Sequence, residues 1–404
     1  MKVLVVTSSY PRFPGDGTAP FVDSIARGVA ALGHEIHVLV PEHRDWAWPA
    51  ADGNLHFHRY RYSPLRSWTP WGFSEALAGG SSIKKQLYPL APVVFASATR
   101  AARKLLADGS FDAVHAHWLV PNGPIGRAAA GSTPLVVSLH GSDVALAERS
   151  SVIRRIARRT FEHTAAVTAP SSDLLVRAKA LGAREPLELV PYGADVATFE
   201  ASQAERAAVR ARLGVEGDDV LVAGIGRLLP VKGFDVLVDA FATASKRDDR
   251  LRLVLVGDGP ERSELARRVE ALDIGKSTTL VGAVNHDEIP GFLAAADVVA
   301  VPSVHRGGYV DGLPNVALEA MAAGRPLIAS RVGGLADLVR PDETGLLVHE
   351  LDADELAEAI VALSRDLERR MRLGAAAKDE TREQRSWTSV ARRFVDVYER
   401  ATHG

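Results

Sequence analysis

Two pairs of charged residues have the types and spacing expected of a site that binds a diphosphate. Arg227 and Lys232 lie five residues apart in the glycine-bounded string GRLLPVKG at residues 226–233. Arginine supplies a planar fork of donors and lysine a point charge, and both can neutralise phosphate charge as a bond to it breaks. A second string, PSVHRGGYVDGLPNVALEAMAAG at residues 302–324, carries the carboxylates of Asp311 and Glu319.

The second string has the pattern of a strand, a flexible loop and a helix. An apolar run at residues 297–301 predicts the strand, and Pro314 and Gly324 are placed where helices begin and end. The first N–H groups of a helix have no partner inside it, and the helix dipole adds positive charge there. We therefore expect the diphosphate to lie against the backbone of five successive residues: Gly312, Leu313, Pro314, Asn315 and Val316.

Asp311 precedes this predicted helix and Glu319 lies about one turn inside it. The two carboxylates therefore reach opposite sides of a bound diphosphate. A nucleotide-sugar has matching chemistry, with a ribose on one side of the diphosphate and a sugar on the other.

The string DGLPNVALEAMAAGRPLIASRVGG, from Asp311 onward, resembles the donor-site motif of the retaining GT-B glycosyltransferases of family 4, the glycosyl transferases group 1. That family carries Glu-x7-Glu here, whereas this chain has Asp311 in the first position, with the same charge and a shorter reach. Arg227 and Lys232 match the family's paired cations. The resemblance implies an α/β GT-B fold, in which two Rossmann-like parallel-sheet domains face each other across a cleft. It also implies that Val284 presents its backbone to the nucleobase.

The first half of the chain reads as a series of strands and helices. Residues 2–7 predict a buried parallel strand, residues 20–32 a helix and residues 34–40 the next strand. The loop between the first strand and the helix contains Gly17. This glycine is either a turn residue or, as the resemblance implies, a point where the backbone approaches the donor phosphate.

A predicted strand at residues 135–139 ends in His140-Gly141-Ser142-Asp143. This string resembles the family's N-domain motif, and the resemblance implies that His140 contacts the donor sugar near the reacting carbon. Asp143 is either an acceptor-side residue or a cap of the next segment. Trp118, which follows the predicted strand at residues 113–117, is a second acceptor-side candidate. The predicted catalytic residues are His140, Asp311, Arg227 and Lys232.

Two further segments leave alternatives open. Residues 42–90 are irregular and contain four tryptophans, which either pack locally or recognise an acceptor or a lipid surface. Residues 149–163 (RSSVIRRIARRTFEH) predict a basic helix with either a solvated face or a patch for anionic lipid or a diphosphate-linked acceptor.

The length of 404 residues is sufficient for two domains. We predict an acceptor-binding domain at residues 1–192 and a nucleotide-sugar-binding domain at residues 193–384, with a hinge at the string PYGAD (residues 191–195). A C-terminal helix in residues 385–404 is expected to return to the first domain. The net charge of −2 does not indicate a nucleic-acid partner, and the lack of cysteine excludes disulfides and thiolate chemistry.

No metal or other cofactor is expected. The string Asp352-Ala353-Asp354 resembles a metal motif of another glycosyltransferase fold, but it precedes a helical run and predicts a helix cap. No other cluster along the sequence has metal-ligand spacing. Charge neutralisation is therefore assigned to Arg227, Lys232 and helix amides.

The predicted function is retaining transfer of a sugar from a UDP- or GDP-sugar to a hydroxyl acceptor, in the synthesis of cell-surface polysaccharide, glycolipid or natural-product glycosides. A nucleotide-sugar epimerase on the same fold and a noncatalytic nucleotide-sugar sensor are the alternatives. The first residues, MKVLVVTSSYPRF, are too short an apolar run for a signal peptide, and no run is long enough to span a membrane. We expect a cytoplasmic protein with possible peripheral contact at the inner membrane face.

Overall fold

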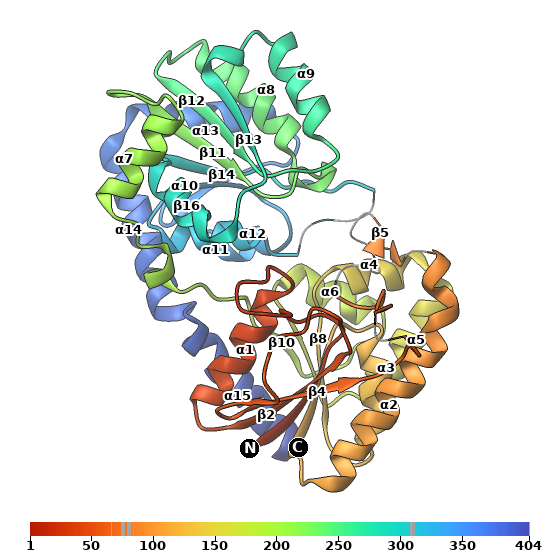
Figure 1. The fold of residues 1–404 in the computed structure, drawn as a ribbon. Helices are drawn as coiled ribbons and strands as arrows, with labels where there is room; N and C mark the ends of the chain where they lie inside the picture. Colours follow the sequence, from red (N-terminus) through yellow and green to blue (C-terminus); the bar gives the residue numbers. More distant parts are fainter. Residues whose placement is uncertain are drawn as a thin grey trace. The chain divides into compact units, whose positions relative to one another are not determined.

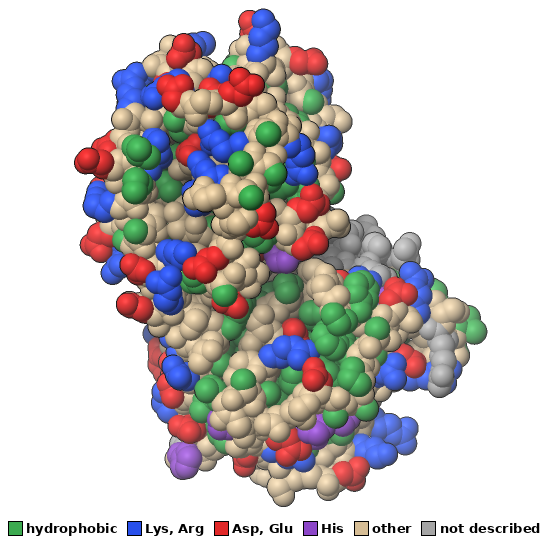
Figure 2. Space-filling model, turned by 60° about the vertical axis from the view of Figure 1, so that its left-hand side comes forward, with side chains coloured by type: hydrophobic (Ala, Val, Ile, Leu, Met, Phe, Trp, Pro, Cys, Tyr) green, Lys and Arg blue, Asp and Glu red, His purple; other side chains and the backbone are tan. Residues whose placement is uncertain are grey.

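The computed structural model describes residues 1–65, 67–73, 77–78, 82–83, 85–307, 310 and 312–403. The chain divides into two compact units (Figure 1). Unit 1 comprises Met1–Pro191 together with Trp387–Gly404, and unit 2 comprises Tyr192–Ser386. The predicted boundaries, at residues 192/193 and 384/385, lie next to these divisions. In Figure 2, Lys and Arg side chains are interspersed with Asp and Glu side chains, in keeping with the net charge of −2.

Unit 1 is built on one sheet with the strand order β10-β9-β8-β7-β1-β2-β4-β3. Every neighbouring pair is parallel except β3 and β4. The central strands are buried on both faces and mostly apolar, as expected for a parallel sheet covered by helices, with two buried histidines in β7. The strands are β1 (Lys2–Val6), β2 (Glu35–Pro41), β3 (Ala51–Asp52), β4 (Leu55–Tyr60), β7 (Ala113–His117), β8 (Leu135–Ser138), β9 (Ala166–Ala169) and β10 (Leu187–Leu189).

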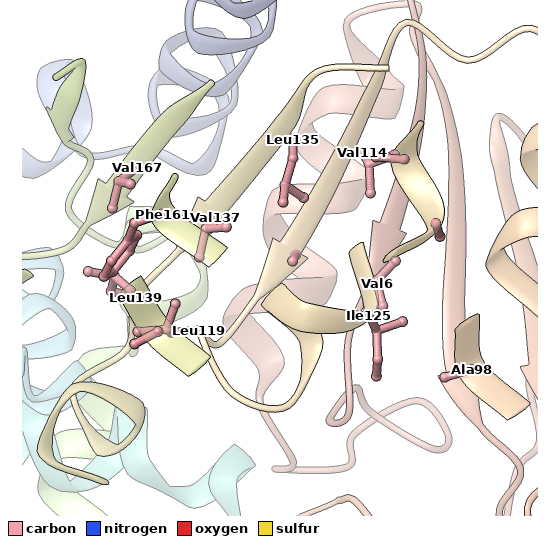
Figure 3. Close-up of a cluster of buried hydrophobic side chains, with 14 of the residues drawn as sticks. Val6, Ala98, Val114, Leu119, Ile125, Leu135, Val137, Leu139, Phe161 and Val167 are labelled. Atoms are coloured by element: carbon pink, nitrogen blue, oxygen red, sulfur yellow. The ribbon is translucent and has the colours of Figure 1, made fainter. Parts of the chain in front are cut away.

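Helices cover both faces of this sheet, over two apolar clusters. Figure 3 shows part of one cluster, in which Ile125 lies near Val6 of the sheet and Phe161 lies near Val167. In the other cluster, the last helix of the chain packs against the first, and Gly28 leaves room for Ala391. The helices are α1 (Pro20–Ala31), α2 (Ala91–Asp108), α3 (Asn122–Ala130), α4 (Ser142–Arg149), α5 (Ser151–Phe161), α6 (Ser172–Ala180) and α15 (Trp387–His403).

Unit 1 departs from the sequence prediction in two places. Residues 42–90 were expected to be irregular, but they contain β4, which extends the central sheet beside β2. In its string LHFHRY, His56 and His58 alternate with Leu55 and Phe57, and Arg59 follows, so β4 has no continuous apolar run. The basic helix expected at residues 149–163 is interrupted at Ser150, whose backbone is extended and whose hydroxyl accepts the N–H of Ile153 to begin α5.

Unit 2 is built on a second, fully parallel sheet with the order β13-β12-β11-β14-β15-β16. Its strands are β11 (Val220–Ile225), β12 (Leu251–Val256), β13 (Thr278–Gly282), β14 (Val298–Val301), β15 (Leu327–Ser330) and β16 (Gly345–Val348). Its helices are α7 (Gln203–Arg212), α8 (Phe234–Ser245), α9 (Arg262–Ala271), α10 (Ile289–Ala295), α11 (Asn315–Ala322), α12 (Gly333–Leu338), α13 (Ala353–Arg365) and α14 (Leu367–Gln384).

The sequence analysis did not identify β16 or α14. The strand is only four residues long, and the helix is strongly polar with few buried positions. Gly374 allows α14 to pack closely behind α11, since a Cβ there would lie 2.2 Å from the carbonyl oxygen of Gly324.

Short elements complete the described chain. They are β5 (Leu77–Ala78), β6 (Ser82–Ile83) and the 3-10 helices η1 (Lys85–Leu90), η2 (Val196–Phe199), η3 (Pro230–Lys232), η4 (Gly275–Ser277) and η5 (His286–Glu288).

Candidate active site

The loops at the carboxyl ends of the unit 2 strands are joined by backbone hydrogen bonds. The N–H of Gly226 donates to Val256 O (2.9 Å), and the N–H of Leu228 donates to Asp258 O (2.9 Å). Gly257 has φ 136°, and a Cβ there would lie 1.9 Å from the carbonyl oxygen of Gly226. Glycine is therefore required for this contact, which holds the loops after β11 and β12 together.

The first of these loops carries both predicted cations. Arg227 is exposed, and Lys232 is half-buried at the end of η3. Gly233 follows with φ 65°, and a Cβ there would lie 2.0 Å from the carbonyl oxygen of Pro302. The N–H of Val304 donates to Val231 O (2.9 Å). The cation loop is thereby held against the segment that leads from β14 to α11.

Two side chains and one backbone N–H from other parts of unit 2 hold the β14–α11 segment. His305 is bound twice by Glu350, through its backbone N–H (2.7 Å) and its Nδ1 (2.9 Å). Arg306 forms a salt bridge (2.6 Å) with Asp235, in the first turn of α8. Gly312 O accepts the N–H of Gly334 (2.6 Å) at the start of α12. Asp311, the predicted first acid, lies outside the described residues.

The predicted phosphate-binding helix is α11, and Pro314 is its N-cap residue. Its first N–H groups belong to Asn315 and Val316, and Leu313 precedes the cap as a buried side chain. Pro314 has no N–H, so within this stretch of backbone it cannot donate a hydrogen bond to a phosphate. Pro314 instead presets the backbone at the helix start.

Glu319 is half-buried within α11. Burial raises the pKa of its carboxyl to about 7, and the positive charge of Lys232 opposes this rise. Two predicted site residues 87 positions apart in the sequence are therefore near enough to interact electrostatically. Val284, the predicted base-side residue, is half-buried in the loop between β13 and η5.

In unit 1, His140 follows β8 within a group of rings. Its Nε2 lies 3.1 Å from Nδ1 of His117, the last residue of β7. The ring centroids of Trp118 and Phe21 lie 4.5 Å and 4.9 Å from that of His140. Burial lowers the pKa of His140 well below its ordinary value and that of His117 to about 3, so both imidazoles are neutral at pH 7.

Asp143 is buried and its carboxylate is bound by backbone N–H groups. Leu119 donates to one oxygen (2.6 Å) and His140 to the other (3.1 Å). Burial raises the pKa of Asp143, and these donors oppose the rise. The carboxylate thus holds the loops after β7 and β8 together. Gly141 is the N-cap residue of α4, and no side-chain hydrogen bond caps the helix there, so neither the capping role nor the acceptor-side role of Asp143 is decided by these bonds.

Trp118 and Gly17 occupy different settings. Trp118 has φ 67°, a conformation that is costly for a bulky residue, and its ring packs beside His140. Gly17 is exposed, and a Cβ there would meet no atom within 4 Å among the described residues. The preceding Asp16 is paired with Arg12 (2.7 Å), which holds this loop. The proposed approach of Gly17 to a phosphate remains a prediction.

The sequence analysis missed His117 and the pairs that hold the β14–α11 segment. The string HAHW at residues 115–118 places two histidines on one face of β7, and this alternation was a usable signal. His305–Glu350 and Arg306–Asp235 join residues far apart in the chain and gave no local signal. Asp352 accepts the N–H of Glu355 (2.9 Å) at the start of α13, which confirms the predicted cap.

Two parallel-sheet α/β units define the class of this protein, that of the GT-B glycosyltransferases. The model of glycosyl transferases group 1 matches residues 205–380, and that of the glycosyl transferase 4-like domain matches residues 16–193. The GDP-mannose-dependent alpha-(1-6)-phosphatidylinositol monomannoside mannosyltransferase of Mycobacterium tuberculosis is 31% identical over 404 residues, covering 98% of this chain and 97% of that protein. The chain belongs to the glycosyl transferases group 1 family and is a glycosyltransferase.

Other similar proteins extend this comparison. The D-inositol 3-phosphate glycosyltransferase of Nocardia farcinica is 34% identical over 323 residues, which cover 74% of this chain and 68% of that protein. Among solved structures, Anabaena Alr3699/HepE in complex with UDP has a TM-score of 0.75 at 21% identity, covering 99% of this chain and 100% of that one. In the described part of the chain, no helix has both the length and the apolar character needed to cross a bilayer.

Proposed function

We propose that this glycosyltransferase moves a mannosyl residue from GDP-mannose to a hydroxyl of an inositol-containing glycolipid, with retention of anomeric configuration and without a metal ion. The observation that carries the donor proposal is that backbone contacts at Val231 and Gly233 hold the loop of the two cations against the segment that leads to α11. The relatives named for GDP-mannose and phosphatidylinositol mannoside chemistry support the choice of donor and acceptor.

In unit 2, we assign the donor diphosphate to Arg227, Lys232 and the first N–H groups of α11. The helix dipole and two cations would together neutralise the charge that grows on the leaving nucleoside diphosphate. Glu319, on the same helix, would accept hydrogen bonds from the ribose hydroxyls. Val284 would present its backbone to the base.

His140 and Asp311 are assigned to the transferred sugar. A neutral imidazole can donate from one nitrogen and accept at the other, so His140 can orient sugar hydroxyls without adding charge. Its bond to His117 restricts the ring. Asp311 would accept from hydroxyls on the other side of the sugar, and Trp118 would lie beside the acceptor.

The proposed transfer proceeds on one face of the sugar. The bond from the anomeric carbon to the donor phosphate oxygen breaks, and its electron pair leaves with the nucleoside diphosphate. The acceptor hydroxyl oxygen forms the new bond on the face just vacated, and its proton passes to that phosphate oxygen. Configuration is retained, and no protein nucleophile is needed. Because the proposed acceptor is a lipid, the reaction would occur by peripheral contact at the cytoplasmic face of a membrane.

The proposal is tested first by donor binding. GDP-mannose is expected to raise the midpoint of thermal unfolding, because a ligand that binds only the folded state stabilises it. GDP-glucose, UDP-glucose and UDP-galactose serve as matched alternatives. A larger shift with a UDP-sugar would overturn the choice of GDP-mannose.

Transfer is tested with phosphatidylinositol mannoside in mixed micelles, with and without EDTA. Formation of an α-linked product at the same rate in both conditions is expected. Epimerisation of the donor sugar in the absence of acceptor would indicate that the protein is an epimerase. Donor binding with no transfer would favour a sensor, and activity abolished by EDTA would refute metal independence.

A further inference from the structure

A group of imidazoles and one carboxylate lies on a single face of the unit 1 sheet, outside the candidate active site. Glu35 and His37 alternate along β2, and His56 and His58 alternate along β4. The two strands are parallel neighbours, and their register places His37 opposite His56. The intervening residues Ile36, Val38, Leu55 and Phe57 belong to the apolar core on the other face.

The four side chains are close enough to touch. Nε2 of His37 lies 2.8 Å from Oε1 of Glu35, and Nε2 of His56 lies 3.7 Å from the same oxygen. Nδ1 of His37 lies 2.8 Å from Nε2 of His58. One potential ligand atom from each of Glu35, His37 and His56 lies within 4.8 Å of the other two.

We propose that Glu35, His37 and His56 form a binding site for a divalent transition-metal ion of the zinc class. Zn²⁺ is bound by imidazole nitrogen and carboxylate oxygen at about 2.0–2.2 Å, which places tetrahedral ligands about 3.3–3.6 Å apart. The 2.8 Å from Oε1 of Glu35 to Nε2 of His37 is shorter than that range, and the 3.7 Å from the same oxygen to Nε2 of His56 is longer. Side-chain shifts of about 1 Å or less would bring these atoms to the coordination distance. Water would complete the coordination sphere on the partly exposed side.

His58 fits the role of a partner behind a metal ligand. Ligating histidines commonly donate their other ring N–H to an acceptor, which fixes the ring. With Nε2 of His37 on the metal, its Nδ1 would carry the proton and donate to Nε2 of His58. Without metal, Nε2–H of His37 donates to Glu35, and Nε2–H of His58 donates to Nδ1 of His37 instead. Both imidazoles stay neutral in each arrangement, so the exchange releases no proton from them.

One cation already lies beside these side chains. Lys2, 3.1 Å from Glu35, is the competing cation. Its Nζ also lies over the ring of Phe111 (5.0 Å), which would hold the ammonium when the metal displaces it from Glu35.

The site lies at the beginning of β2 and β4, whereas His140 follows the end of β8. In a parallel sheet these are opposite edges. The ion would therefore clamp β4 to the central strands and would take no part in sugar transfer. The sequence analysis found no metal-ligand spacing because His37 and His56 are brought together only by strand pairing.

The test is a calorimetric titration of the untagged, EDTA-stripped and desalted chain with Zn²⁺ at pH 7.5. We expect one saturable site that raises the midpoint of thermal unfolding. His56→Ala and Glu35→Gln should each weaken binding tenfold or more. These side chains are 33% and 42% exposed, so both variants are expected to fold. His163→Ala, which removes an exposed histidine of unit 1, is the matched control and should bind as the parent does.

Co²⁺ in place of Zn²⁺ gives a second measurement. Visible absorption bands typical of four-coordinate cobalt should appear in the parent and in His163→Ala and should be lost in His56→Ala. Equal Zn²⁺ affinity in the parent, His56→Ala and Glu35→Gln would overturn the proposal, as would the lack of any saturable binding. Sugar transfer by the parent should be the same with and without Zn²⁺.

Discussion

Replacing Lys232 with alanine should lower kcat/KM for sugar transfer about a hundredfold or more. Lys232 is half-buried at the end of η3, and its charge acts on Glu319 of α11, the helix to which the donor diphosphate is assigned. Two unit charges about 4 Å apart interact by about 4 kcal/mol at an effective dielectric constant of 20. Water that enters the space left by the side chain recovers part of this energy. A net loss of about 2.7 kcal/mol corresponds to a hundredfold change in rate.

The same substitution should change the titration of Glu319. The charge of Lys232 opposes the rise in the pKa of Glu319 to about 7. Without that charge the pKa rises further, so the carboxylate assigned to the ribose forms at higher pH. Donor affinity is expected to rise with pH as Glu319 ionises. In Lys232→Ala this rise should therefore occur at higher pH than in the parent.

Steady-state kinetics and donor titration between pH 6 and pH 9 measure both effects. Lys246→Ala, which removes an exposed lysine just after α8, is the matched control and should behave as the parent does. Circular dichroism should show unchanged secondary structure in both variants. Near-parent kinetics in a folded Lys232→Ala protein would refute the assignment of this cation to the diphosphate.

Three further perturbations test other parts of the structure. Glu319→Gln should abolish tight donor binding. It should also raise the free energy of unfolding of the ligand-free protein by about 1–3 kcal/mol above pH 8 in urea unfolding, because a carboxyl whose folded pKa is raised to about 7 opposes folding once it ionises. This gain in stability should vanish below about pH 4.5, where the carboxyl is protonated in both states. Gly233→Ala should lower the free energy of unfolding by about 2 kcal/mol or more, because φ is 65° and a Cβ would lie 2.0 Å from Pro302 O. Gly17→Ala should lower it little, since a Cβ there would meet no described atom within 4 Å. Tyr398→Phe should lower the free energy of unfolding in urea by about 1–2 kcal/mol, because the phenol oxygen lies 2.8 Å from Nδ1 of buried His115. An unchanged midpoint of urea unfolding would show that this hydrogen bond contributes nothing to stability.

The sequence was most informative where local pattern and chemistry coincide. Apolar runs predicted β1 and β8 in unit 1 and β14 in unit 2, since a parallel strand is buried on both faces wherever it lies. Arg227 and Lys232 could be recognised together because one short loop carries both. Pro314 and Gly324 likewise delimited α11 through their backbone restrictions.

Elements without a local signature were missed. The polar helix α14 is positioned by the close approach of Gly374 to Gly324, and β4 by pairing with β2. His117 was not recognised as a site residue because its importance lies in a 3.1 Å contact with His140, which follows another strand. The alternation in HAHW shows that His115 and His117 share a face of β7, but not which residue of another segment they meet.

The sequence by itself therefore determined two series of α/β units and the strings that carry the donor-site cations and acids, because strand burial and helix punctuation are local properties. The tertiary structure decided the electrostatic environment. Burial in unit 2 raises the pKa of Glu319 to about 7 against the opposing charge of Lys232. Glu35, His37 and His56 face one another because β2 pairs with β4. Burial and proximity depend on which segments pack together, and that is settled only when the whole chain folds.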